Sequence, residues 1–278
     1  MSKFEILTAK DRTKQTKGIT GCIFGKSGIG KTSLLWTLDA NKTLFIDLEA
    51  GDLAIEGWQG DSIRPRTWQD CRELACFIGG PNPALRDEQV YSHAHYKSVA
   101  EKFKDASLEK YDTIFIDSIT VAARLCFGWC KSQAVAEKSG KFDTRSAYNI
   151  HGQEMIAWLT QLQHTRNKNI WFVGILDEKH DDLGRKYYSP QLEGSKTSLE
   201  LPGIVDEVIT MAAVKDENDN QKRAFICQTI NEFNYPAKDR SGKLSVTEEA
   251  HLGKLMQKIK QKPIVANVSE QKLLTKSI

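Results

Sequence analysis

The sequence of 278 residues has no apolar run long enough to cross a bilayer, and its first residues, MSKFEILTAK, lack the apolar core of a secretory signal. We therefore expect no membrane association and a cytoplasmic location. Only two cysteine pairs lie close in sequence, Cys71 with Cys76 and Cys126 with Cys130, and neither forms a C-x-x-C. Reduced, mostly buried thiols are the expectation, in preference to a metal site.

Charge of neither sign dominates, because the formal net charge is only +3. Residues 1–17 carry +3 and residues 252–278 carry +5, which leaves −5 for residues 18–251. This balance excludes a uniformly basic nucleic-acid module. We interpret 1–17 as a flexible basic arm, 18–251 as one α/β core and 252–278 as a basic helix and tail. Both tails are equally consistent with solvated, frayed ends.

The most specific motif is a phosphate-binding loop, G-x-x-x-x-G-K-[ST], at Gly25 to Thr32. An apolar run at 19–24 predicts a buried strand before it, and 31–38 predicts the first turns of a helix after it. Lys31 can reach the β- and γ-phosphates, and the Thr32 hydroxyl can ligate Mg²⁺. The residues predicted to bind ATP are Gly25, Lys26, Ser27, Gly28, Ile29, Gly30, Lys31, Thr32 and Ser33.

We predict three further strands from the apolar segments 43–48, 113–117 and 169–176. Acidic residues lie at or just after the end of each segment. Strands that alternate with helical segments indicate an α/β fold with a mainly parallel central sheet and helices on both faces. Ligands of such sheets bind at the carboxyl ends of the strands. Asp47, Glu49, Asp117 and Asp177 all fall at these ends, around one predicted nucleotide.

Two of these acids suit specific roles in ATP hydrolysis. Asp117 ends the strand TIFID, where a carboxylate acts on Mg²⁺; as an alternative, Asp117 or Ser118 caps the helix that follows. Glu49 lies just past LFID, where it can orient the attacking water; the alternative is a solvated loop acid.

The segments LFIDLEAG and TIFIDSIT resemble the corresponding segments of RecA-like recombinases. The resemblance is closer to short RecA-like proteins of bacteriophages, through FIDLEAGDLA, GWQGDSIRPRTW, IGGPNPAL, EMIAWLTQLQHTR and PAKDRSG, and it covers about residues 18–255. It implies a RecA-like P-loop NTPase fold, with Glu49 as the catalytic glutamate and Asp117 as the Walker B acid. It also implies a role in phage recombination or single-strand annealing, in the cytoplasm of the host cell.

The segment Lys238 to Gly242 resembles the K-x-R-x-G element of RadA-like and hexameric-helicase ATPases. That resemblance implies that Lys238 and Arg240 are catalytic residues that reach the γ-phosphate of a neighbouring subunit in a head-to-tail ring or filament. The alternative is an exposed turn. Two departures stand out: Asp177-Glu178-Lys179 replaces the γ-phosphate-sensing glutamine that ends the strand in RecA, and the RecA C-terminal domain is missing.

The resemblance also implies that two loops, about 131–147 and 177–198, hold single-stranded DNA. The candidate contacts are Lys138 and Lys141 with Arg145 in the first loop, and Arg185 and Lys186 in the second. An ordinary solvated surface is the alternative for each loop. A single-strand-binding protein is a further candidate partner.

These observations predict an ATPase that uses Mg²⁺, is stimulated by DNA, and has an active site shared between subunits. Two alternatives stay open. One is a nucleotide-gated assembly or partner-binding protein with little DNA affinity. The other, a small-molecule P-loop kinase, is less favoured because neither an arginine-rich lid nor an acceptor pocket is evident.

Overall fold

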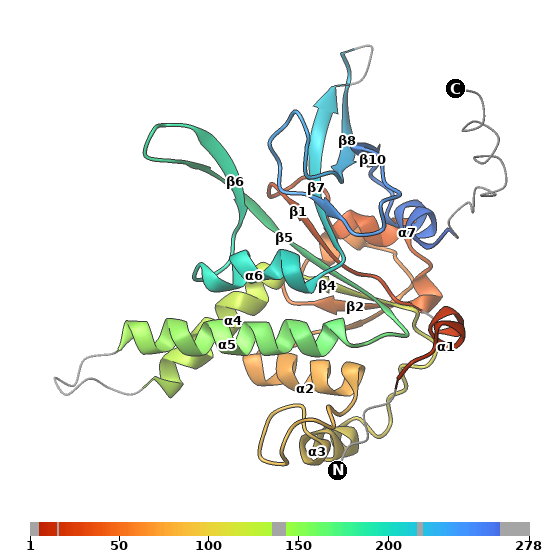
Figure 1. The fold of residues 1–278 in the computed structure, drawn as a ribbon, viewed down its shortest axis with the longest axis vertical. Helices are drawn as coiled ribbons and strands as arrows, with labels where there is room; N and C mark the ends of the chain where they lie inside the picture. The colour runs from red at the N-terminus through yellow and green to blue at the C-terminus, as the bar shows by residue number, and fades with distance from the viewer. Residues whose placement is uncertain (1–5, 16, 135–142, 216–218, 262–278) are drawn as a thin grey trace, which may run out of the picture.

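The computed structural model describes residues 6–15, 17–134, 143–215 and 219–261. These residues build one sheet in the order β10-β8-β7-β1-β5-β4-β2-β3, to which β6 and β9 pair at β5 and β7 (Figure 1). The strands are β1 Thr20–Gly25, β2 Thr43–Asp47, β3 Asp61–Ile63, β4 Thr113–Asp117, β5 Asn169–His180, β6 Lys186–Pro190, β7 Glu207–Lys215, β8 Gln221–Ile226, β9 Lys238–Asp239 and β10 Thr247–Glu249.

The centre of the sheet is parallel and the margins are antiparallel. β1 pairs in parallel with β5 and β7, and β4 pairs in parallel with β5 and β2. β8 runs antiparallel to both β7 and β10. β1, β2 and β4 are buried along their whole length, because helices cover both of their faces.

The helices fall into two groups. The α-helices are α1 Ala9–Lys14, α2 Trp68–Gly79, α3 His93–Lys102, α4 Ile119–Gln133, α5 Thr144–Gln163, α6 Lys196–Ile204 and α7 Leu252–Lys260. The 3₁₀ helices are η1 Thr32–Thr37, η2 Ala40–Lys42 and η3 Asp52–Ile55. The helix expected over 31–38 is therefore present as η1, with i to i+3 bonds such as Leu34 N to Lys31 O (3.1 Å).

Alternate residues of each central strand pack on opposite faces. Cys22 and Phe24 of β1 belong to the cluster that includes α2, α4 and α5. Ile23, between them, belongs to the cluster that includes η1 and α7. The expected α/β architecture, with a mainly parallel sheet and helices on both faces, is confirmed.

The segment 177–198, expected to be a polar loop, contains regular structure. β5 continues to His180 and pairs antiparallel with β6, which makes a hairpin that projects from the body (Figure 1). α6 then begins at Lys196, contains Pro202 and packs beside α5. Most residues at the tip of the hairpin are exposed and polar, and this composition is typical of a loop, so the sequence did not predict these elements.

All six cysteines are buried and free, as expected. Among them, the sulfur atoms of Cys126 and Cys130 lie 3.9 Å apart, one helical turn from each other on α4. None of the helices within the described parts of residues 6–261 has the length and apolar character needed to cross a lipid bilayer.

Candidate nucleotide site

The phosphate loop leaves β1 at its carboxyl end and enters η1. Gly28 and Gly30 have φ angles of +78° and +98°, values that glycine adopts without strain. Gly25 must also be glycine, because a Cβ there would lie 2.7 Å from the Met211 carbonyl oxygen of β7. The loop thus has its tight form because three of its positions exclude or disfavour side chains.

Lys31 lies across the loop. Its Nζ donates hydrogen bonds to the carbonyl oxygens of Gly25 and Lys26, at 3.0 and 3.1 Å. Burial lowers the pKa of this lysine, while the carboxylates of Asp117 and Glu49 act to raise it. Lys31 therefore folds back on the loop, within electrostatic range of Asp117 and Glu49.

Thr32 and Asp117 meet although 85 residues separate them. Thr32 Oγ1 donates a hydrogen bond of 2.5 Å to Oδ2 of Asp117. Asp117 is buried at the end of β4, and β5 is the one strand between β4 and β1. Burial raises the pKa of Asp117 to about 6; the Glu49 charge also raises it, whereas the Thr32 hydrogen bond and Lys31 lower it.

Glu49 stands in a turn that Asp47 holds. Oδ1 of Asp47 accepts the backbone N–H groups of Glu49 and Gly51, each at 3.2 Å. Ser118 Oγ donates a hydrogen bond to the Glu49 carboxylate. Glu49 is exposed, so one of its faces is accessible to water while Ser118 fixes the other.

Arg64 completes this turn, and sequence reasoning missed it. Its Nε donates to Oδ2 of Asp47 at 3.2 Å, and its guanidinium also pairs with Asp52. The side chain of Asp47 is fully buried. The burial of Asp47 indicates that such a partner must exist, because a buried carboxylate needs a cationic or hydrogen-bonding partner.

The donor set fits Mg²⁺ and a polyphosphate. A hydroxyl and a carboxylate in contact are hard oxygen ligands of the kind that Mg²⁺ prefers. The glycines of the loop leave its backbone N–H groups free of overlying Cβ atoms, which suits phosphate oxygens. Residues Lys26 to Thr32 could hold the phosphates, and Thr32 with Asp117 could hold the metal ion.

Lys238 and Arg240 lie far from their own phosphate loop. β9 pairs with the beginning of β7, at Glu207 and Val208, level with the beginning of β1. The phosphate loop follows the other end of β1. The structure therefore does not bring Lys238 or Arg240 together with Lys31, Glu49 and Asp117 within one chain.

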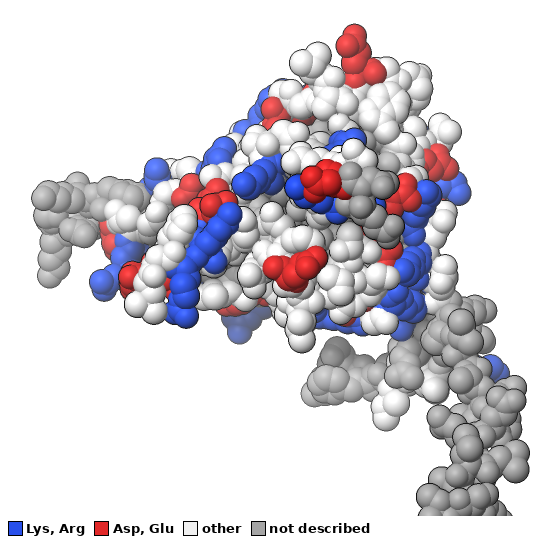
Figure 2. Space-filling view, turned by 90° about the horizontal axis from the view of Figure 1, so that it is seen from above, with Lys and Arg blue, Asp and Glu red and all other residues white. Residues whose placement is uncertain are grey.

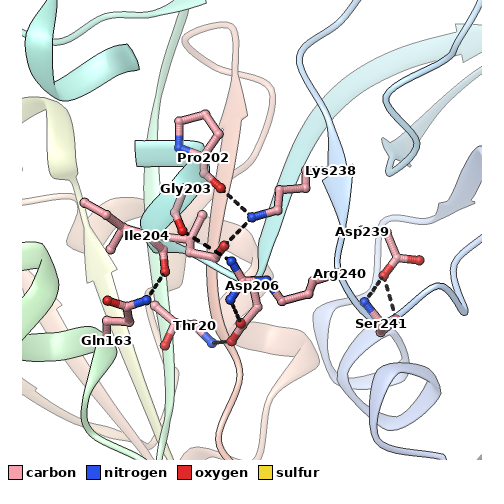
Figure 3. Close-up of polar contacts among 11 residues, drawn as sticks. Thr20, Gln163, Pro202, Gly203, Ile204, Asp206, Lys238, Asp239, Arg240 and Ser241 are labelled. Atoms are coloured by element: carbon pink, nitrogen blue, oxygen red, sulfur yellow. Dashed lines mark hydrogen bonds and ion pairs between the residues drawn. The ribbon is translucent and has the colours of Figure 1, made fainter. Parts of the chain in front are cut away.

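Both cations have partners near the end of α6 (Figure 3). Lys238 Nζ donates to the carbonyl oxygens of Pro202 and Val205, the latter at 2.8 Å. Arg240 donates to Oδ1 of Asp206 at 2.7 Å, and Oδ2 of the same carboxylate accepts the Thr20 N–H at 3.1 Å. Asp239 holds the turn by accepting from Ser241 and Gly242.

The predicted DNA contacts are not gathered in one place by the described residues. Lys138 and Lys141 lie outside those residues, and Arg145, expected in a loop, is exposed in the first turn of α5. Arg185 pairs with Asp181 and Lys186 pairs with Glu178, at 2.9 and 2.8 Å. Figure 2 shows basic and acidic side chains interspersed on the face that it presents.

Comparison with known proteins gives one extensive match. A family model described as an AAA domain matches residues 17–241. None of the curated protein sequences is similar enough to count as a match. The matched range begins before β1 and ends after Arg240, so it contains the phosphate loop, Glu49, Asp117 and Lys238.

Among solved structures, similarity is found to a RadB recombinase and to the assembled ATPase EscN of the type III secretion system of enteropathogenic E. coli. The RadB match has 10% identity and a TM-score of 0.34, and covers 81% of this chain and 92% of that chain. The EscN match has 16% identity and a TM-score of 0.35, and covers 70% of this chain and 43% of that chain.

Proposed function

The chain belongs to the AAA domain family, and on that premise we propose that it binds ATP with Mg²⁺ and hydrolyses it. One observation carries the proposal: Lys31, Thr32, Asp117 and Glu49, from three separate segments, converge at the carboxyl ends of β1, β2 and β4. A phosphate loop alone indicates binding. The added carboxylates supply what hydrolysis requires, a held metal ion and an aligned water.

Each residue has a role that its contacts support. The loop binds the polyphosphate, and Lys31 neutralises charge that develops on the transferred phosphoryl group. Thr32 and Asp117 would hold Mg²⁺, which would supply neutralisation of the phosphate charge. Glu49, held by Ser118 and by the turn at Asp47, orients the attacking water from its exposed side.

We propose further that the active site is completed by a neighbouring subunit. Lys238 and Arg240 stand at the opposite end of the sheet from their own phosphate loop, so they can act only on the nucleotide of another chain. A head-to-tail contact provides this geometry, and it can close a ring or extend a filament. Arg240 would then exchange Asp206 for the γ-phosphate, a charge-assisted contact of the same kind.

The proposed nucleic-acid partner is single-stranded DNA, in phage recombination or strand annealing. The projecting β5–β6 hairpin supports it, because Lys186 lies 5.0 Å from the ring centre of Tyr188 and Tyr187 is exposed beside them. Aromatic side chains next to cations are typical of surfaces that stack bases. Arg145 on α5 adds a further exposed cation.

One observation favours the alternative, a nucleotide-gated assembly factor with little DNA affinity. Two cations of the hairpin, Arg185 and Lys186, are already paired with Asp181 and Glu178 of the same hairpin. DNA would have to displace these carboxylates before it gained the contacts.

ATP turnover with and without single-stranded DNA at low salt distinguishes the two, when followed by gel filtration with a non-hydrolysable ATP analogue. We expect stimulation by DNA and a large assembly. Assembly with an unchanged turnover rate would support the alternative, and transfer of phosphate to a metabolite would support a kinase.

A further inference from the structure

The β7–β8 hairpin extends past the phosphate loop. β7 pairs with β1 as far as Thr210 opposite Phe24, but it continues to Lys215, and β8 accompanies it from Gln221. Figure 1 shows the two strands rising beyond the end of β1. The hairpin therefore lies beside the phosphate loop, although it follows that loop by about 200 residues in the sequence.

Arg223, an exposed residue of the β7–β8 hairpin, projects on the side of the phosphate loop. Arg223 lies opposite Ala213, two residues from the buried pair Met211 and Phe225. Residues two apart on a strand share a face, and Met211 and Phe225 pack in the cluster that contains η1. Arg223 thus projects on the face of the sheet that carries the phosphate loop and its helix.

The guanidinium of Arg223 reaches the loop itself. A Cβ placed on Gly30 would lie 2.2 Å from Nη1 and 3.5 Å from Cζ of Arg223, so the guanidinium rests against the Cα of Gly30. Gly30 immediately precedes Lys31. The presence of glycine at this position leaves room for that approach.

Arg223 also differs from two other arginines described above. Arg64 pairs with Asp47, and Arg240 pairs with Asp206. Within the part of the chain that the structure describes, Arg223 is exposed and makes no hydrogen bond or ion pair. A guanidinium presents five donors in a planar fork, which suits a phosphate and can also stack on an aromatic ring.

We propose that Arg223 contacts the nucleotide held by the phosphate loop, and that it does so from the same chain. The proposal rests on ATP binding as proposed above. It assigns to Arg223 a part in nucleotide affinity, whereas Arg240, contributed by a neighbour, acts on turnover. The ligand is a nucleoside di- or triphosphate, whose anionic and aromatic parts a guanidinium can both bind.

Calorimetric titration of Arg223→Ala and Arg223→Lys with ADP tests this. We expect Arg223→Ala to weaken ADP binding roughly tenfold or more, the effect of losing one charge-assisted contact, and Arg223→Lys to weaken it less. Lys222→Ala is the matched control. Lys222 is the adjacent exposed cation, but it lies opposite Val214, on the other face of the hairpin, so its loss should leave ADP affinity unchanged.

Inorganic pyrophosphate as a second probe locates the contact. A parallel loss of pyrophosphate affinity in Arg223→Ala places the guanidinium on the phosphates, and a loss confined to ADP places it on the nucleoside. The thermal unfolding midpoint without nucleotide should match that of the wild type, because Arg223 has no partner to lose among the described residues.

Wild-type affinity for ADP in Arg223→Ala would overturn the proposal while leaving ATP binding intact. A wild-type protein that does not bind ADP would instead overturn the proposed function, and this proposal with it.

Discussion

The Thr32 hydroxyl donates a hydrogen bond of 2.5 Å to Oδ2 of Asp117, and this contact joins the end of the phosphate-loop motif to the end of β4. Thr32 begins η1 after β1, Asp117 ends β4, and β5 lies between β1 and β4, so only the folded sheet brings the two residues together. Both oxygens are hard ligands of the kind that Mg²⁺ prefers. The contact supports the proposal that these two residues hold the metal ion.

The raised pKa of Asp117, about 6, predicts a pH-dependent Mg²⁺ requirement. A carboxyl with a raised pKa keeps its proton to a higher pH, and the protonated form does not bind Mg²⁺. The Mg²⁺ concentration that gives half-maximal ATP turnover should therefore rise as the pH falls through about 6.

Asp117→Asn is the control for this titration, because the nucleotide itself also binds protons in this range. The difference between the two proteins isolates Asp117. A wild-type requirement that follows the Asp117→Asn curve on both sides of pH 6 would refute the assignment.

Arg240→Ala should reduce ATP turnover by roughly 100-fold or more while ATP affinity changes little, if the residue acts on the transition state of a neighbour as proposed. Turnover of the wild type should also rise steeply with protein concentration. The ion pair with Asp206 is partly exposed, so its loss should cost at most about 1 kcal/mol of folding stability.

A mixing experiment tests whether this residue acts across subunits. Lys31→Ala lacks a working phosphate loop but keeps Arg240, and Arg240→Ala has the reverse defect. Mixed assemblies contain sites with one intact half from each chain, so mixing should restore part of the activity. Two inactive proteins that stay inactive when mixed would show that no site is shared.

Arg64→Ala should destabilise the turn that carries Glu49. The buried Asp47 would lose a cationic partner and keep two backbone N–H donors, which predicts a loss of about 1–2 kcal/mol in urea unfolding. Turnover should also fall, since Glu49 loses its orientation. Arg66→Ala, an exposed arginine two residues later, is the matched control and should change neither quantity.

Lys186→Ala should weaken binding of single-stranded DNA and reduce the slope of log affinity against log salt by about 0.7, the contribution of one phosphate contact. Fluorescence anisotropy with a labelled oligonucleotide measures both. Lys97→Ala, an exposed lysine of α3 on the far side of the molecule from the hairpin (Figure 1), should leave the slope unchanged. An unchanged slope in Lys186→Ala as well would remove the hairpin from the DNA surface.

The local sequence was enough to predict the phosphate loop and the strands that precede Gly25, Glu49 and Asp117. The apolar runs before Gly25, Glu49 and Asp117 form buried strands, and their ends meet because parallel strands place their carboxyl ends at one edge. The loop glycines were predictable from the motif itself.

What could not be predicted depends on register and on long-range packing. The β5–β6 hairpin pairs exposed residues whose polar composition indicates a loop. Arg223 approaches Gly30 only because β7 and β8 extend past the end of β1, and no local sequence pattern predicts that extension. The pairing of Arg64 with Asp47 likewise depends on the end of β3 lying beside the end of β2.

Phosphate release from Mg²⁺-ATP by the wild type and by Glu49→Gln, measured side by side with nucleotide affinity, is the most direct test of ATP hydrolysis at this site. We expect a measurable wild-type rate, a loss of roughly 100-fold or more in Glu49→Gln, and ADP affinity that is the same in both. Glu56→Gln, a nearby exposed acid, should hydrolyse ATP at the wild-type rate. Equal rates for the wild type and Glu49→Gln, or no hydrolysis by the wild type at any protein concentration, would contradict the proposed mechanism.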